Sequence, residues 1–214
     1  MARILDILLS GLALLLLSPL LLLIVVTLRL TGEGEVLFVQ QRIGRGGQLG
    51  TGTVTVKDDP RVLPVGRVLR KTKLNELPQL LNIFFGDMSI VGPRPQTQRC
   101  FDAFPAQSQI EILKVRPGLS GVGSIIFRGE ENMMSASGSP EQFYDQVIMP
   151  YKGKLEEWYV AHQGLRTYIE CIGTTVWVVL FSSSPIAWTV FRGLPAPPPE
   201  LAEAVNWPGA DRSA

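Results

Sequence analysis

An uncharged stretch of 22 residues near the N-terminus limits what this chain can fold into more than any other feature. It runs from Ile7 to Leu28, and 12 of its residues are leucine. With a rise of about 1.5 Å per residue, one helix over this stretch is ~33 Å long, enough to cross a hydrocarbon core of roughly 30 Å. The apolar region of a cleaved signal peptide is shorter, at about 7–15 residues. The stretch therefore predicts a membrane anchor over residues 1–30.

Ser18-Pro19 lies in the middle of this anchor, and a proline inside a helix removes a backbone donor and kinks the helix. Length and kink leave two arrangements open: the helix spans the membrane, or it re-enters and returns to the same face. Behind the anchor, between Val36 and Arg99, there are 10 Lys and Arg against 4 Asp and Glu. Because basic segments stay on the cytoplasmic side, we expect the remaining chain to be cytoplasmic.

The residues after the anchor suffice for one compact domain. We expect it over 31–193, followed by a Pro-rich tail over 194–214 in which residues 195–199 form an extended, poorly ordered end. Strand-forming residues predict short strands at 35–41, 53–57 and 124–127. Gly-rich or polar residues predict loops at 44–52 and 132–139. Helical spacing and a Ser139-Pro140 opening predict helices at 62–72, 77–84, 107–115, from 139 onwards, and at 167–181. The predicted fold is a small mixed α/β domain with a short irregular sheet.

Two further features limit the class of protein. The apolar segment 167–181 fits either a core helix or an amphipathic helix lying in the membrane interface, and both remain open. Cys100 and Cys171 are far apart, and the single His162 has no other ligand at metal-binding spacing. The sequence therefore predicts neither a disulfide framework nor a zinc site. The basic region lacks interleaved aromatic residues, so nucleic-acid binding is not expected.

The first candidate site is the start of the predicted helix at 77–84. Asn75 is placed as its N-cap, and Pro78 occupies the first turn, where its missing donor costs little. Free N–H groups at a helix N-terminus can bind phosphate, and Arg70, Lys71 and Lys73 lie immediately before this one. The alternative is an ordinary capped helix with a solvated basic face.

Two arginines next to prolines form the second candidate site. Arg94 lies between Pro93 and Pro95, and Arg116 precedes Pro117. The prolines stiffen the backbone and lower the entropy lost when a guanidinium is fixed in place. Guanidinium groups suit bidentate recognition of phosphate oxygens, so both arginines are candidate phosphate ligands. Alternatively, either arginine could simply lie in an exposed turn of the chain at the protein surface.

Several runs together resemble the bacterial sugar transferases, the monotopic polyprenyl-phosphate phosphoglycosyl transferases. They are the Ser-Pro of the anchor, QQRIGRGG from Gln40, ELPQLLN from Glu76, GDMSIVGPRP from Gly86, VRPGLSG from Val115 and MPYKGKLEEWYV from Met149. The resemblance covers nearly the whole chain. It implies transfer of a phospho-sugar from a UDP-sugar to a polyprenyl (undecaprenyl) phosphate, with release of UMP. That reaction starts a lipid-linked glycan such as an exopolysaccharide, an O-antigen or a glycoprotein glycan. It also implies a location at the cytoplasmic face of the bacterial inner membrane and a re-entrant anchor.

The resemblance implies roles for individual residues as well. The family pattern places an Asp nucleophile and a Glu before L-P-Q-L, and this chain has Asn75 and Glu76 there. Glu76 is then the acid of the pair and a candidate ligand for Mg²⁺, the implied cofactor. Arg70, Arg94 with Pro93, and Arg116 are implied to contact phosphate. An amide is a poor nucleophile, and the family's segment between Gly47 and Thr51 is shortened here. These departures leave an alternative, a non-catalytic membrane scaffold or pseudo-enzyme of the same fold.

Overall fold

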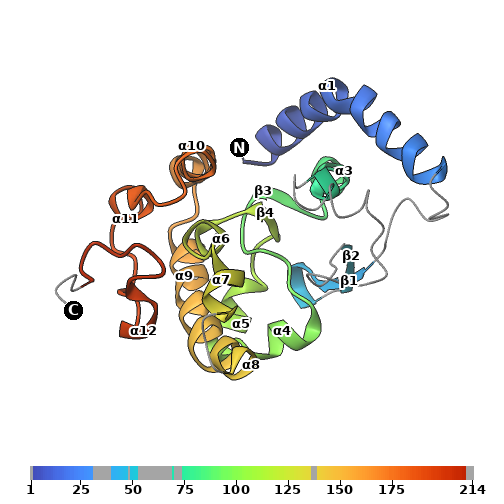
Figure 1. Cartoon of the computed structure of the whole chain (residues 1–214). Coiled ribbons are helices and arrows are strands. Elements are labelled where there is room, and N and C mark those ends of the chain that lie inside the picture. The colour runs from blue at the N-terminus through green and yellow to red at the C-terminus, as the bar shows by residue number, and fades with distance from the viewer. Residues whose placement is uncertain are drawn as a thin grey trace.

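The N-terminal anchor is one long helix with a bend. The computed structural model describes residues 2–30, 40–47, 49–52, 69, 74–135 and 139–210. Helix α1 (Ala2–Leu30) contains Pro19, and Figure 1 shows the helix bending about halfway along its length. The bend has the cause expected from the sequence, because Pro19 cannot donate to the preceding turn. Among the described residues, α1 is the one helix long and apolar enough to cross a membrane.

Four short strands form two separate sheets of two strands each in the part of the chain that the structure describes. Strands β1 (Gln40–Ile43) and β2 (Leu49–Gly52) pair antiparallel, with the 3₁₀ turn η1 (Arg45–Gly47) between them. Strands β3 (Ser89–Val91) and β4 (Gly118–Ser120) pair in parallel, so that Val91 lies opposite Ser120. The predicted short, irregular sheet is confirmed, and it belongs to a mostly helical domain.

The other regular elements of the described chain are helical. Those between β2 and β4 are η2 (Leu74–Glu76), α3 (Gln79–Phe85), α4 (Gln98–Asp102) and α5 (Ala106–Ile112). Those after β4 and before the C-terminal part are α6 (Val122–Ile126), α7 (Glu130–Ser135), α8 (Pro140–Phe143), the π-helical turn η3 (Tyr144–Ile148) and α9 (Met149–Ala161). The last are α10 (Leu165–Leu180), α11 (Ile186–Val190) and α12 (Pro199–Ala202).

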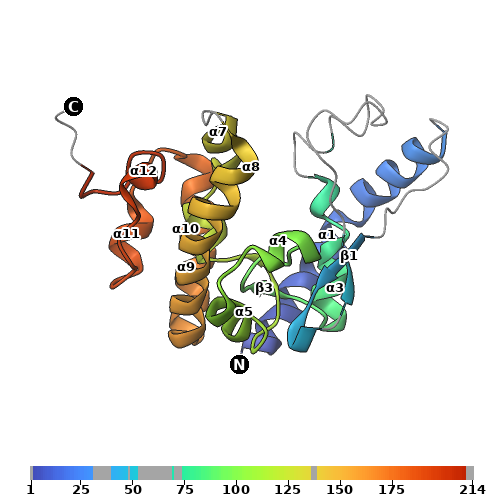
Figure 2. The ribbon, with the colours of Figure 1, turned by 90° about the horizontal axis from the view of Figure 1, so that it is seen from below.

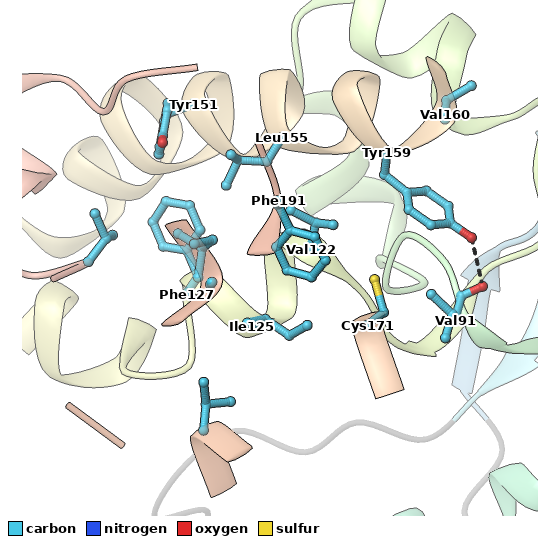
Figure 3. Packing of buried hydrophobic residues seen from close by; sticks show 14 of the residues in the cluster. Val91, Val122, Ile125, Phe127, Tyr151, Leu155, Tyr159, Val160, Cys171 and Phe191 are labelled. Carbon is cyan, nitrogen blue, oxygen red and sulfur yellow. Dashed lines mark hydrogen bonds between the residues drawn. The ribbon is translucent and has the colours of Figure 1, made fainter. Parts of the chain in front are cut away.

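The main hydrophobic core lies around helix α9. Its buried face packs against α6 and α10, as the close view in Figure 3 shows. Side chains from seven elements or their flanking loops meet there, among them Val91, Val122, Leu155, Cys171 and Phe191. Figure 2 shows α9 and α10 in the middle of the domain, with α1, α3 and β1 on one side and α11 and α12 on the other. The core helices therefore separate the anchor from the C-terminal part of the chain.

Several expected elements differ from the structure. Of residues 124–127, expected as a strand, the first three belong to α6 and Phe127 is its C-cap; Ile125 N donates to Gly121 O at 2.9 Å. A four-residue apolar run is too short for its periodicity to distinguish the two structures. Strand β2 lies inside the expected loop at 44–52, and α7 extends into the expected loop at 132–139. The expected helices at 77–84, 107–115, 139 onwards and 167–181 are confirmed as α3, α5, α8 and α10.

The other sequence-based expectations fall outside the described residues or need a correction. The strand at 53–57 and the helix at 62–72 lie outside the described residues apart from Leu69, and the strand at 35–41 is described only at its last two residues, which belong to β1. The expectation of a poorly ordered end at 195–199 needs a correction, because Tyr151 OH donates to Pro195 O at 2.8 Å and α12 begins at Pro199. Leu201 is completely buried and Val205 nearly so, and both belong to the main core. The tail is ordered because these two apolar side chains fill the space beside η3 and α11.

Candidate functional site

The two site segments predicted from the sequence meet at an ion pair between Glu76 and Arg94. Glu76 ends the turn η2, and Arg94 follows β3 after Gly92 and Pro93. The Arg94 Nη2 atom donates to the Glu76 Oε1 atom at 2.6 Å. The Arg94 side chain is 33% exposed and that of Glu76 20%, so one side of the pair is open to an incoming ligand. A carboxylate and a guanidinium held together in this way can engage a phosphate and a metal ion at one place.

A close approach of two backbone segments holds Arg94 in position. Gly92 N donates to Ser120 O at 2.8 Å, and Gly118 N donates to Pro93 O at 2.8 Å. A Cβ atom on Gly118 would lie 2.1 Å from Gly92 N, a separation that side-chain carbons do not reach. Glycine is required here because the backbones touch. The GPRP and RPGLSG runs of the sequence are therefore two halves of one corner.

Arg42 is a third member of this site that the sequence reasoning did not single out. It is buried on β1, and its Nη1 atom donates to the carbonyl oxygen of Pro95. The neighbouring Ile43 N donates to Gln96 O at 2.9 Å, so β1 is docked onto the segment that carries Arg94. Burial, and next the positive charge of Arg94, lower the pKa of Arg42 to about 10. Two guanidinium groups this close favour an anion beside them. The only signal in the sequence was the QQRIGRGG run, to which no role had been given.

Asn75 lies beside Glu76 in η2, and its predicted role as a helix cap is wrong. The α-helix begins after Pro78, with no side-chain cap, because the chain first makes a 3₁₀ turn in which Leu77 N donates to Leu74 O at 3.2 Å. The Asn75 Oδ1 atom is buried and has no hydrogen-bond partner within the described part of the chain. A buried oxygen without a donor is a candidate ligand for a cation.

The other two predicted phosphate ligands are not joined to the pair by any hydrogen bond or ion pair of the described residues. Arg116 precedes β4, and its carbonyl oxygen lies close to Gly92. Within the described ranges no hydrogen bond or ion pair joins its side chain to Glu76 or Arg94. Arg70 lies outside the described residues. The structure therefore brings together Asn75, Glu76, Pro93 and Arg94, and places the backbone of Arg116 next to them.

The residues present at the pair fit a magnesium ion. No group of three or more His, Cys, Asp or Glu side chains that could hold a metal occurs in the described ranges. Mg²⁺ does not need such a cage, because it usually takes one or two protein oxygens and completes its shell with water and substrate phosphate. The Glu76 carboxylate and the buried Asn75 Oδ1 supply such oxygens at adjacent positions.

A second group of charges is buried within the domain, on α9 and α7. Lys152 is 3% exposed, and its Nζ donates to Glu130 Oε2 at 2.8 Å. Glu156 is 1% exposed, and its Oε2 atom has no hydrogen-bond partner in the described part of the molecule. Burial raises the pKa of Glu156 to about 7, against the opposing effect of the Lys152 charge. Sequence reasoning gave no sign of this group, because both residues look like surface charges on a helix.

Comparison with known proteins agrees with the motifs in this site. Residues 1–182 match the family described as bacterial sugar transferase. The chain is 38% identical over 150 residues to the UDP-glucose:undecaprenyl-phosphate glucose-1-phosphate transferase of Klebsiella pneumoniae, covering 62% of this chain and 32% of that protein. It is 36% identical over 155 residues to the exopolysaccharide production protein ExoY of Rhizobium meliloti, covering 58% of this chain and 68% of that protein.

A third relative is the undecaprenyl-phosphate galactose phosphotransferase of Salmonella typhimurium, which is 34% identical over 125 residues. The match covers 58% of this chain and 23% of that protein. The chain thus spans about a third or less of the two relatives named as sugar-phosphate transferases, and about two thirds of the exopolysaccharide protein.

Proposed function

This chain belongs to the bacterial sugar transferase family, and from that premise we propose that it transfers a phospho-sugar from a UDP-sugar to a polyprenyl phosphate. The diphosphate bond of the donor breaks, UMP leaves, and the lipid phosphate ends up joined to the sugar phosphate. The named substrates of the Klebsiella pneumoniae and Salmonella typhimurium relatives support this substrate class. Their names give no support to the alternative of a non-catalytic scaffold.

The observation that carries the proposal is the Glu76–Arg94 pair, at 2.6 Å and open on one side, with Arg42 buried next to it. The reaction builds up negative charge on phosphate oxygens, and fixed guanidinium groups stabilise that charge without reorganising. In this proposal Arg94 orients Glu76 and contacts the donor diphosphate, and Arg42 adds positive charge behind it. Arg70 and Arg116 complete the set of phosphate ligands.

Glu76 is the carboxylate of the pair that can attack phosphorus, since the neighbouring Asn75 is an amide. We assign to Glu76 the covalent step, in which its oxygen bonds to the sugar-linked phosphorus as the bond to UMP breaks. An oxygen of the polyprenyl phosphate then attacks the same phosphorus and frees the carboxylate. Asn75 and Glu76 are the proposed Mg²⁺ ligands, together with the donor diphosphate. When bound, the ion offsets diphosphate charge.

The anchor supports a site at the membrane surface. Several leucines of α1 point away from the domain, Leu15 being 71% exposed. Phe85 on α3 and Leu180 on α10 are 74% and 69% exposed, which is unusual for such large apolar side chains in water. We propose that these surfaces face lipid at the cytoplasmic side of the inner membrane, with α10 lying in the interface. A soluble donor and a lipid acceptor can then meet at headgroup level.

Release of UMP tests the proposal. Purified full-length protein in lipid nanodiscs is incubated with Mg²⁺, undecaprenyl phosphate and each of a panel of UDP-sugars. We expect UMP release with at least one sugar, and mass spectrometry should find the phospho-sugar on Glu76. Asn75→Asp should raise turnover, because it restores a second carboxylate.

Two variants sharpen this test. Glu76→Gln should abolish both UMP release and the covalent adduct. Glu111→Gln is the matched control, because Glu111 is also a partly exposed glutamate in an ion pair, with Lys114 at 2.5 Å, and it should keep turnover. No UMP from either the wild type or Asn75→Asp with any sugar would refute the proposed activity. An adduct on a residue other than Glu76 would refute the assignment of the covalent step.

A further inference from the structure

A buried carboxylate on the membrane anchor contacts the strand that leads to the site. Asp6 of α1 is 1% exposed. Its Oδ1 atom accepts hydrogen bonds from Ile90 N at 2.8 Å, Ser89 Oγ at 3.0 Å and Tyr168 OH at 2.8 Å. In the described part of the chain no Lys, Arg or His forms an ion pair with it. A carboxylate removed from water without a cation is costly unless donors surround it, so three convergent donors indicate a specific role.

The same end of the anchor also holds the helix that follows Glu76. Arg3 Nη2 donates to Phe84 O at 2.8 Å, and Arg3 Nη1 donates to Ile83 O at 2.5 Å, so Arg3 caps the C-terminus of α3. The helix ends at Gly86, whose φ of +106° belongs to the left-handed region that favours glycine. A Cβ atom there would lie 3.0 Å from Arg3 Nη2, so glycine also makes room for the arginine.

The contacts of Arg3 and Asp6 lie at one end of a unit formed by α3 and β3, and the candidate site lies at its other end. From Glu76 the chain runs along α3, turns at Gly86, and returns along β3 to Arg94. Arg3 and Asp6 hold the turn end, and the ion pair lies at the open end. On its other side β3 is fixed by the main core, where Tyr159 OH donates to Val91 O at 3.1 Å (Figure 3). The position of β3, and with it Arg94, is therefore set from both the anchor and the core.

We propose that Asp6 is a positioning residue for the reaction: from within the membrane anchor it fixes β3 and so places the Arg94 guanidinium against Glu76. Tyr168 ties the same carboxylate to α10, so the anchor, the interfacial helix and the site move as one body. The buried Asp6 carboxylate then links the position of the anchor in the lipid to the alignment of Glu76 and Arg94. The effect on turnover rests on the proposed function, whereas the effect on β3 does not.

The test compares variants that remove the acceptor with one that keeps it. Asp6→Leu removes all three hydrogen bonds, Asp6→Asn keeps an Oδ1 acceptor, and Tyr168→Phe removes a single donor. Ser108→Ala is the matched control, because Ser108 is equally buried and its Oγ donates to Glu157 Oε1 at 2.5 Å, a hydrogen bond that does not involve β3. All are made in the full chain in nanodiscs.

The first measurement is hydrogen exchange at the Ile90 amide, which donates to Asp6 and needs no turnover. We expect exchange at least ~10-fold faster in Asp6→Leu, a smaller rise in Tyr168→Phe, and wild-type exchange in Ser108→Ala. Asp6→Asn should approach the wild-type rate. If Asp6→Leu does not fold, Tyr168→Phe still decides, because unchanged Ile90 exchange in that variant overturns the proposal.

The second measurement is steady-state kinetics for the donor. Asp6→Leu should lower kcat/KM at least ~10-fold, with kcat and KM changing in the same pattern as in Arg94→Ala. Asp6→Asn should restore most of the activity, which a purely structural defect would not predict. Equal impairment of Asp6→Asn and Asp6→Leu, or loss of kcat/KM in Ser108→Ala to the same extent, overturns the positioning role. Absence of turnover in both the wild type and Asn75→Asp would refute the proposed function, and hydrogen exchange alone would then test the contact between Asp6 and β3.

Discussion

Replacing Glu156 with glutamine should remove a pH dependence from the stability of this protein. Glu156 is 1% exposed, and burial raises its pKa from 4.5 to about 7. The folded state therefore holds a proton on this carboxyl at pH values where the unfolded chain has lost it. The protonated carboxyl of Glu156 stabilises the folded state. This contribution to the free energy of unfolding is fully present below about pH 4.5 and is lost as the pH rises to about 7. Glutamine has nearly the same shape and never ionises.

The structure gives the size of the effect. At about 1.4 kcal/mol for each pKa unit, a rise from 4.5 to about 7 corresponds to about 3 kcal/mol in the free energy of unfolding. The positive charge of Lys152 lowers the pKa of Glu156, and the pKa of about 7 includes this effect. The amide of glutamine adds a cost of about 1–3 kcal/mol if its hydrogens find no acceptor, but that cost does not change with pH.

The assay is urea unfolding in detergent micelles, followed by tryptophan fluorescence at pH values from 5 to 8. The informative quantity is the unfolding free energy of the wild type minus that of Glu156→Gln, because other titrating groups cancel in it. We expect this difference to fall by about 2–3 kcal/mol between pH 5 and pH 8, mostly below pH 7. Ile148→Val, at another fully buried position, should give a difference that does not depend on pH. If the difference in unfolding free energy for Glu156→Gln also stays constant between pH 5 and pH 8, the reasoning is refuted.

Three further predictions test other parts of the structure. Arg94→Ala should lower kcat/KM by about 100-fold, since it removes a guanidinium from the developing charge. Arg99→Ala, which breaks an ion pair exposed to solvent, should stay within about twofold, and equal losses would contradict the site. Leu201→Ala should lower the free energy of unfolding by about 2–5 kcal/mol in urea titrations, because Leu201 is completely buried; no change would mean that the tail is not part of the core. Gly118→Ala should unfold the corner beside Arg94, seen as lost heteronuclear NMR dispersion or a lower melting temperature. Gly173→Ala, with nothing within 4 Å of the new carbon, should be tolerated and is the control.

Local patterns were sufficient for much of the fold. The uncharged leucine-rich run predicted α1, and its proline predicted the bend. Apolar residues at helical spacing predicted α3, α5 and α10, because a helix is stabilised by contacts between residues three and four apart. The motif residues Glu76 and Arg94 were both recognised from the sequence, and they do form an ion pair.

Long-range contacts explain what was missed. Strands β3 and β4 are too short for a periodic signal, and they exist because two glycine-containing segments pair with each other. Arg42 was missed because it is placed at the site by a hydrogen bond to Pro95, which lies 53 residues away in the chain. The tail was expected to be disordered from its prolines, yet Leu201 and Val205 find apolar space in the core.

The amino-acid sequence alone was enough to predict an apolar anchor, a mixed α/β domain behind it, and the motif residues of a bacterial sugar transferase. Each of these follows from composition or from motifs within a short window. Which charged side chains contact one another depends instead on how distant segments pack. Asp6 and Tyr168 are 162 residues apart, and their hydrogen bond exists only because α1, β3 and α10 pack together. The ionisation of Glu156 is set in the same way, because burial depends on which distant side chains surround a group.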